Sequence, residues 1–189
     1  TISPADVQAQ EALISGADIF ITQLEQPMDA AMAALRIANA GRPVTILNPA
    51  PAADLPDGML ALCDYVTPNE TEAERLTGVA VQSVDDARRA ADLLIAKGAG
   101  AAIITLGENG ALYHTATESV HVGATRAGTV VETTGAGDAF HGGFATALSE
   151  GATPIDAVRF GCATAAISVT RAGTAPSMPT RAEVDALLA

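Results

Sequence analysis

The chain has 189 residues, of which 49 % are hydrophobic, 3 % aromatic and 17 % charged, and Trp is absent. This length suits one domain with a substantial core, which Ala, Val, Leu and Ile must fill, as they do where helices pack on a sheet. The formal net charge of −12 excludes nucleic acid as an expected partner, because the protein would repel a phosphate backbone. We therefore expect a single α/β domain over residues 1–189.

Apolar runs in the chain are short and its cysteines are few. The longest runs, residues 99–106 and 162–169, fall well short of the roughly 20 residues that span a bilayer, so no membrane partner is expected. Cys63 and Cys162 fit neither a disulfide framework nor a CxxC metal pattern, which predicts reduced core residues in a cytoplasmic protein. The chain begins at Thr1 without Met, as an incomplete or processed chain would.

The first 106 residues alternate between helix and strand patterns. Ser3 and Pro4 open a helix, because a capping residue precedes Pro at the first helical position, and Gly16 ends it. The predicted elements are a helix over 4–14, a strand over 17–24, a helix over 27–40, strands over 43–47 and 64–67, a helix over 84–96 and a strand over 101–106. Such alternation predicts a mostly parallel sheet with helices on both faces and ligands at the carboxyl ends of the strands.

The last third of the chain is predicted to be mainly helical. Residues 111–114 and 119–122 predict a small antiparallel pair, and the apolar residues around Val130 predict a further strand. A helical hairpin over 137–149 and 154–169, joined at Gly151, and a helix over 180–188 complete the chain. No repeat, low-complexity tract or linker marks a domain boundary.

A glycine-rich turn at residues 133–138 lies between a predicted strand and a predicted helix. The small residues Gly135, Ala136 and Gly137 would let backbone N–H groups approach an anion, and the helix N-terminus adds a fractional positive charge. For such a turn in isolation, the commoner interpretation is an ordinary turn in which Asp138 complements the helix dipole.

Two better-known glycine motifs do not fit this segment. Phe140 stands where a dinucleotide fingerprint beginning at Gly135 needs its third glycine, and Gly143 stands where a P-loop needs Lys. Neither a Rossmann dehydrogenase nor a P-loop NTPase is therefore expected.

Five further positions stand after predicted strands or at a helix start. Asn69 and Glu72 share one helix face and match a helix cap with its capping-box partner. Thr105 and Gly107 match an ordinary turn, and Glu25 matches a solvated side chain at a strand end. The residue patterns alone leave a binding role open for all five.

The motif TTGAGDAF at residues 133–140 is similar to the signature of the ribokinase-like family of sugar and nucleoside kinases. Further matches follow in the family's order: QLE at 23–25, LNPAPA at 47–52, TPNETEAE at 67–74, ITLG at 104–107 and RAGTAPS at 171–177. Together they cover nearly the whole chain, and NPAPA and TPNETEAE resemble the ribokinase branch more than the fructokinase or adenosine kinase branches. The resemblance implies ATP-dependent phosphorylation of a sugar hydroxyl, with D-ribose converted to ribose 5-phosphate. The alternatives are another sugar or nucleoside kinase of the family, or a catalytically silent nucleotide-binding module.

The resemblance also implies roles for individual residues. Asp138 would take the proton from the sugar hydroxyl, while the backbone of residues 135–138 holds the transferred phosphoryl group. Asn69, Thr105 and Gly107 would contact the nucleotide, Glu72 would help to place Mg²⁺ through water, and Glu25 would bind the sugar.

A monovalent cation site, for K⁺, is implied beside the phosphate cradle. Its ligands would be the Glu132 side chain with carbonyl or hydroxyl oxygens of Thr134, Ser168, Arg171, Gly173 and Ser177. The family usually has Asp where this chain has Glu132, so the carboxylate here extends further from the backbone by one methylene group.

The second departure from the family is at the amino-terminal end. Family members carry, before the position of Thr1, a segment with a sugar-binding motif and the strands of a lid, and the sequence contains neither. We therefore expect the 189-residue chain alone to bind nucleotide weakly and to be inactive, and the complete enzyme to be a homodimer.

Overall fold

The computed structural model describes residues 1–189. The chain falls into two compact units, the first made of residues 1–106 and 112–121 and the second of residues 107–111 and 122–189. The expectation of a single domain stays a prediction.

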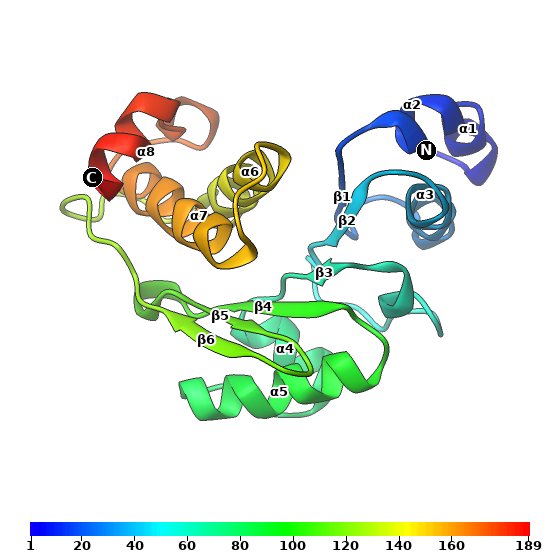
Figure 1. The fold of residues 1–189 in the computed structure, drawn as a ribbon, viewed down its shortest axis with the longest axis horizontal. Helices are drawn as coiled ribbons and strands as arrows, with labels where there is room; N and C mark the ends of the chain where they lie inside the picture. The colour runs from blue at the N-terminus through cyan, green and yellow to red at the C-terminus, as the bar shows by residue number, and fades with distance from the viewer. The chain divides into compact units, whose positions relative to one another are not determined.

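A six-stranded sheet in the order β1-β2-β3-β4-β5-β6 organises the first unit (Figure 1). Its strands are β1 (Ile19–Thr22), β2 (Val44–Leu47), β3 (Tyr65–Val66), β4 (Ala101–Thr105), β5 (Ala111–His114) and β6 (Ser119–Val122). The first four pair in parallel, with Ile19 opposite Val44 and Tyr65 opposite Ala101. A short turn, in which the Thr115 N–H donates to the Glu118 carbonyl at 2.8 Å, joins β5 to β6. The predicted α/β class with a mostly parallel sheet is confirmed.

Three helices of the first unit bury an aliphatic core against one face of this sheet. The helices of this unit are α1 (Pro4–Gln8), α2 (Glu11–Gly16), α3 (Met28–Ala40), α4 (Glu70–Thr77) and α5 (Val84–Ala96), with the short 3₁₀ turn η1 (Leu60–Leu62), and the three that bury the core are α3, α4 and α5. Leu35 of α3 and Leu94 of α5 pack in one core with Leu47, Val66 and Ile104 of the strands. Side chains alternate along a strand, so the neighbouring Ile46 and Ile103 point to the opposite face, and they are fully buried as well. In Figure 1, α5 runs alongside β4.

The helix expected over residues 4–14 is two short helices, α1 and α2. Gln10, with φ −106° and ψ 14°, breaks the helical path between them. Neither helix has a buried residue, but both contact α3. Because no residue of this segment is anchored in the core, packing does not enforce one continuous helix. The break at Gln10 lets both α1 and α2 lie against α3.

The second unit is a helical layer. It contains η2 (Gly107–Asn109), α6 (Ala136–Ser149), α7 (Pro154–Ser168), η3 (Ala175–Ser177) and α8 (Arg181–Leu188). Gly151, with φ 86°, turns the chain between α6 and α7, as the sequence predicted. The two helices approach closely at Gly143, where an added Cβ atom would lie 2.4 Å from Thr164 Oγ1. α8 packs on α7 through Val184 against Ala163.

The strand predicted before the glycine-rich turn does not form. Val130 and Val131 are 60 % and 61 % exposed and lie in irregular structure. The N–H groups of Val131 and Glu132 both donate to the Val169 carbonyl just after α7, at 2.7 and 3.2 Å. The apolar, β-branched composition suggested a strand, but this backbone bonds to a helix end instead of another strand.

Two further sequence predictions concern the core and the membrane. Cys63 and Cys162 are buried free thiols, as predicted, and burial raises their pKa values to about 12 and about 11. None of the helices has the length and apolar character needed to span a bilayer.

Candidate functional site

The four parallel strands end at one edge of the sheet, and the predicted residues of the first unit follow them. The segments after β1 and β2 run side by side, because the Asn48 N–H donates to the Thr22 carbonyl at 2.9 Å and the Leu24 N–H to the Ala50 carbonyl at 2.8 Å. Glu25 is exposed in the first of these segments. Its place at a carboxyl strand end is where α/β sheets bind ligands.

Asn69, Glu72 and Thr105 are brought together at the same edge. Asn69 is the N-cap of α4: its Oδ1 accepts from the Glu72 N–H at 2.9 Å, and Glu72 Oε2 accepts from the Asn69 N–H at 2.8 Å. Asn69 also forms a parallel bridge with Thr105 at the end of β4. Gly107 follows with a left-handed φ of 52°, which suits glycine. The predicted capping box therefore exists, and it lies beside the predicted nucleotide turn.

Glu72 is unusual among the acidic residues in being buried, with 8 % of the residue exposed. Burial raises its pKa, and the hydrogen bond from the Asn69 N–H only partly opposes that shift. A buried carboxylate is costly unless a partner compensates its charge. Carboxylate and amide oxygens are the ligands that Mg²⁺ prefers, so Glu72 and Asn69 fit a magnesium ion by their donor chemistry.

The predicted phosphate cradle starts α6 in the second unit. Gly135 is the N-cap with φ 82°, a conformation that L side chains rarely adopt. Ala136 donates its N–H to the Thr133 carbonyl at 3.1 Å, while Gly137 and Asp138 are exposed in the first turn. Gly137 has no atoms near the position of an added Cβ, which leaves room for an anion at its backbone. The arrangement joins a helix N-terminus, small residues of which Gly137 is exposed, and a carboxylate.

The predicted cation ligands surround the loop that follows α7. Glu132 Oε2 accepts from the Gly173 N–H at 2.8 Å, the Ser168 carbonyl accepts from the Arg171 N–H at 3.1 Å, and the Ser177 hydroxyl donates to the Thr174 carbonyl at 2.6 Å. The structure thus places these segments together. One oxygen of the Glu132 carboxylate accepts from an N–H donor, the Gly173 backbone, in this arrangement. The ligand roles of Glu132, Thr134 and their partners stay predictions.

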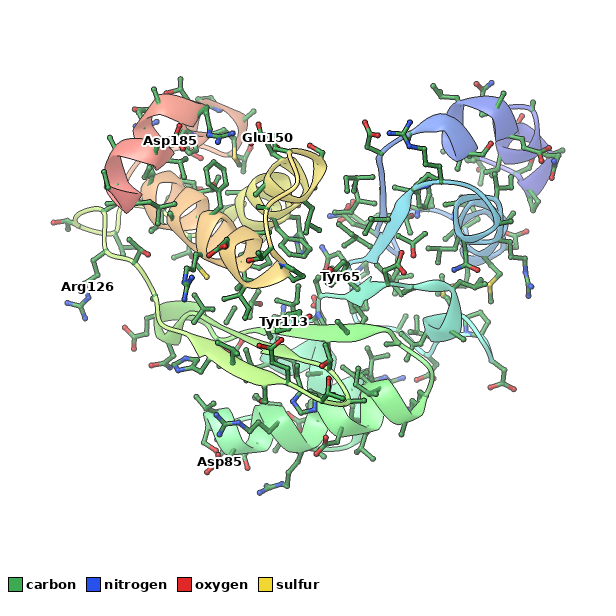
Figure 2. All side chains as sticks on the ribbon, in the orientation of Figure 1. Tyr65, Asp85, Tyr113, Arg126, Glu150 and Asp185 are labelled. Atoms are coloured by element: carbon green, nitrogen blue, oxygen red, sulfur yellow. The ribbon has the colours of Figure 1, made fainter.

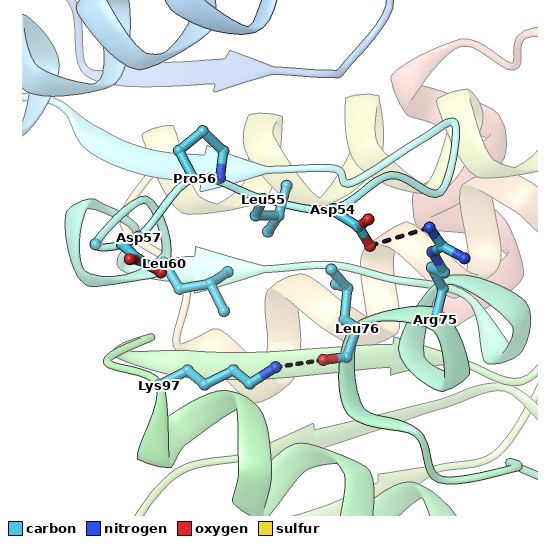
Figure 3. A pocket seen from close by; sticks show the side chains of 9 residues that line it. Asp54, Leu55, Pro56, Asp57, Leu60, Arg75, Leu76 and Lys97 are labelled. Atoms are coloured by element: carbon cyan, nitrogen blue, oxygen red, sulfur yellow. Dashed lines mark hydrogen bonds and ion pairs between the residues drawn. The ribbon is translucent and has the colours of Figure 1, made fainter.

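A cavity of about 340 Å³ in the first unit contains none of the predicted site residues (Figure 3). It lies where α4 and α5 end, and its charged lining is balanced between two basic and two acidic side chains. Asp54 and Arg75 pair at 3.0 Å, and Lys97 Nζ donates to the Leu76 carbonyl. Its residues are scattered between positions 54 and 97 without a motif that could have predicted it, and we assign it no ligand.

Comparison with known proteins matches this chain to one family. Residues 3–181 match the family described as pfkB family carbohydrate kinase. A ribokinase of Haemophilus influenzae is 43 % identical over 182 residues, a ribokinase of Staphylococcus aureus 37 % over 187, and a deoxyribokinase of Salmonella typhi 37 % over 179. These alignments cover 96 %, 98 % and 94 % of this chain, but 59 %, 61 % and 58 % of the relatives.

Solved structures give the same result. The ribokinase of Thermotoga maritima superposes with a TM-score of 0.85 at 37 % identity, over 94 % of this chain and 59 % of that one. The Arabidopsis thaliana ribokinase complexed with ribose and ATP superposes with a TM-score of 0.91 at 30 % identity, over 99 % and 59 %. The chain thus spans about three fifths of the length of these relatives. It belongs to the pfkB family of carbohydrate kinases.

Proposed function

We propose that the protein transfers the γ-phosphoryl group of ATP to a sugar hydroxyl, converting D-ribose to ribose 5-phosphate. The observation that carries the proposal is the start of α6, where the left-handed Gly135 precedes an exposed Asp138 in a first helical turn made of small residues. Support for ATP and ribose comes from the relatives, which include a ribokinase complexed with both.

Asp138 is the proposed general base. As the sugar oxygen bonds to the γ-phosphorus, the bond from that phosphorus to the β,γ-bridging oxygen breaks, and the hydroxyl proton passes to the Asp138 carboxylate. Phosphoryl transfer asks the protein mainly for positioning and charge stabilisation. An ordinary ionised carboxylate suffices, because the attacking hydroxyl loses its proton late in the reaction.

The backbone of residues 135–137 is the proposed phosphoryl cradle. The protein carries a formal charge of −12, and backbone N–H groups, the helix N-terminus and Mg²⁺ would supply positive potential for the phosphoryl group. A helix terminus stabilises an anion by about 0.3 to 2 kcal/mol. Because Ala136 donates to Thr133 in this structure, we assign the first contact with the phosphoryl group to Gly137.

The remaining roles fall to residues that end or follow strands β1, β3 and β4. Asn69, Thr105 and Gly107 would contact the nucleotide, and Glu25 would accept a hydrogen bond from the sugar. Glu72 and Asn69 would hold Mg²⁺, largely through water, and the bound ion would neutralise phosphate charge.

Substitution of Asp138 tests the proposed chemistry. In the full-length protein, Asp138→Asn should lower kcat by about 10² to 10⁴ and leave ATP affinity nearly unchanged, since a general base acts mainly in the transition state. Asp156→Asn is the matched control, because Asp156 occupies the first turn of the neighbouring helix α7 without being assigned to the site. A coupled assay and calorimetric titration measure both quantities. Near-normal kcat in Asp138→Asn would refute the assignment.

The identity of the sugar has one close alternative, 2-deoxyribose, because a deoxyribokinase is as similar to this chain as one of the ribokinases. Competition between ribose and 2-deoxyribose in one reaction compares their kcat/KM values. Preference for ribose supports the proposal, and preference for deoxyribose, another sugar or a nucleoside replaces it. ATP binding without turnover of any acceptor would instead indicate a silent nucleotide-binding module.

A further inference from the structure

One side chain joins two segments that flank the start of α6. Glu132 lies just before the glycine-rich turn, and its Oε2 accepts from the N–H of Gly173, 41 residues later, at 2.8 Å. Gly173 has a left-handed φ of 86° in the loop between α7 and η3. The bond is charge-assisted, so it is stronger than a bond between neutral groups.

Further contacts hold the same two segments together. The N–H groups of Val131 and Glu132 bond to the Val169 carbonyl. On the other side, an added Cβ on Gly135 would lie 3.4 Å from Thr174 Cβ and Cγ2, so the loop lies against the residue that begins α6. The hydrogen bond from Gly173 to Glu132 lies between these two contacts, since Gly173 is the residue before Thr174.

We propose that Glu132 is a positioning residue, which fixes Gly135 and the first turn of α6 for phosphate by holding the Gly173 loop against them. This inference rests on the proposed function of that turn. The reach of Glu is essential to it, because Asp would draw the carboxylate back by about 1.5 Å, the length of one C–C bond. The direct bond would hold the two segments together without an ion, as a bound cation would by bridging them.

The two roles of Glu132 respond oppositely to conservative substitutions. As a cation ligand, Glu132 would contribute its negative charge, so Glu132→Gln would weaken that role, while Glu132→Asp, which restores the residue that the family usually has, would keep it. A hydrogen-bonding link needs an acceptor at the right distance, so Glu132→Gln would keep most of the role and Glu132→Asp would lose it.

Hydrogen exchange of the full-length protein without substrate tests the link directly. We expect Glu132→Asp and Glu132→Ala to lower the protection of the Gly173 N–H by about 10- to 100-fold, and Glu132→Gln by less than about tenfold, because its neutral bond is weaker. Glu150→Gln is the matched control at the other end of α6, where Glu150 pairs with Arg181. Figure 2 labels Glu150 near Asp185, the second partner of Arg181.

The outcomes separate the proposal from its rivals. Two results would overturn the direct link in favour of a cation. In one, the Gly173 N–H is protected as in wild type in Glu132→Asp but not in Glu132→Gln. In the other, its protection rises when K⁺ replaces a bulky organic cation at constant ionic strength. If the exchange rates follow the expected order but kcat and the KM for ATP are the same in all variants, the link exists and its positioning role is refuted. A wild-type protein without kinase activity would refute the proposed function, whatever the exchange shows.

Discussion

Two helices of this chain, α4 and α8, begin with the same capping motif but differ in the charge state that their surroundings favour. In each, the N-cap side chain accepts from the third helical N–H, and the glutamate at that position accepts from the N-cap N–H. Glu72 of α4 is buried, which raises its pKa. The Glu183 side chain of α8 is 42 % exposed, and Arg171, followed by Thr180, lowers its pKa to about 2.

The difference shows that the capping motif sets where a helix begins, while the surroundings set the free-energy cost of keeping its glutamate ionised. Glu183 has a cationic partner in Arg171. No ion pair is found for Glu72, although it is the more buried of the two. A desolvated carboxylate without a cation is expensive, and such groups concentrate at functional sites. The comparison therefore favours a ligand cation at Glu72 and a structural role for Glu183.

The largest expected effect separates the two glutamates by function. Glu72→Gln keeps the acceptor for the Asn69 N–H and removes the charge, so MgATP affinity in the full-length protein should fall by about 10- to 100-fold, as for other residues that support a bound metal. Glu183→Gln, the matched control, should change it by less than about threefold. Calorimetric titration with MgATP measures both, and equal affinities of the two variants would make Glu72 a helix cap only.

The sheet and its ligand edge could be predicted from the sequence because their signals are local. Each parallel strand is a short β-branched apolar run between turn residues, and parallel strands end at one edge. The structure places Asn69 and Thr105, which lie at or just after the ends of predicted strands, side by side at that edge. Capping boxes are likewise readable from residues three apart.

The loops around the phosphate cradle could not be predicted in this way. Val131 has the composition of a strand residue, but whether it finds a strand partner depends on Val169, 38 positions later. The bond between Glu132 and Gly173 likewise depends on how α6 and α7 pack, which no local pattern encodes. The break at Gln10 has the same origin, because contacts with α3 decide it.

A smaller effect separates capping from nucleotide binding at Asn69. Asn69→Ala should lower the free energy of unfolding by about 1 kcal/mol, and so should Ser83→Ala, which removes the N-cap bond of α5 to the Asp86 N–H. MgATP affinity should fall only in Asn69→Ala. Urea unfolding and calorimetric titration give the two quantities. Unchanged affinity in Asn69→Ala would leave its side chain with the capping role alone.

The smallest expected effect is a pH dependence of opposite sign at the two glutamates. The folded-state pKa of Glu72 lies above the ordinary value of 4.5, so the folded state binds more protons just above pH 4.5, and this residue's contribution to stability falls as pH rises through that window. The folded-state pKa of Glu183 lies at about 2, so its contribution is present above pH 4.5 and is lost as pH falls toward 2. The free energy of unfolding should therefore depend less on pH above 4.5 in Glu72→Gln and less on pH below 4.5 in Glu183→Gln, each compared with wild type. Urea unfolding at intervals between pH 2.5 and 6.5 measures the three curves. A Glu72→Gln curve parallel to wild type above pH 4.5 would show that the Glu72 carboxylate is not desolvated, and the contrast between the two capping boxes would then have no electrostatic basis.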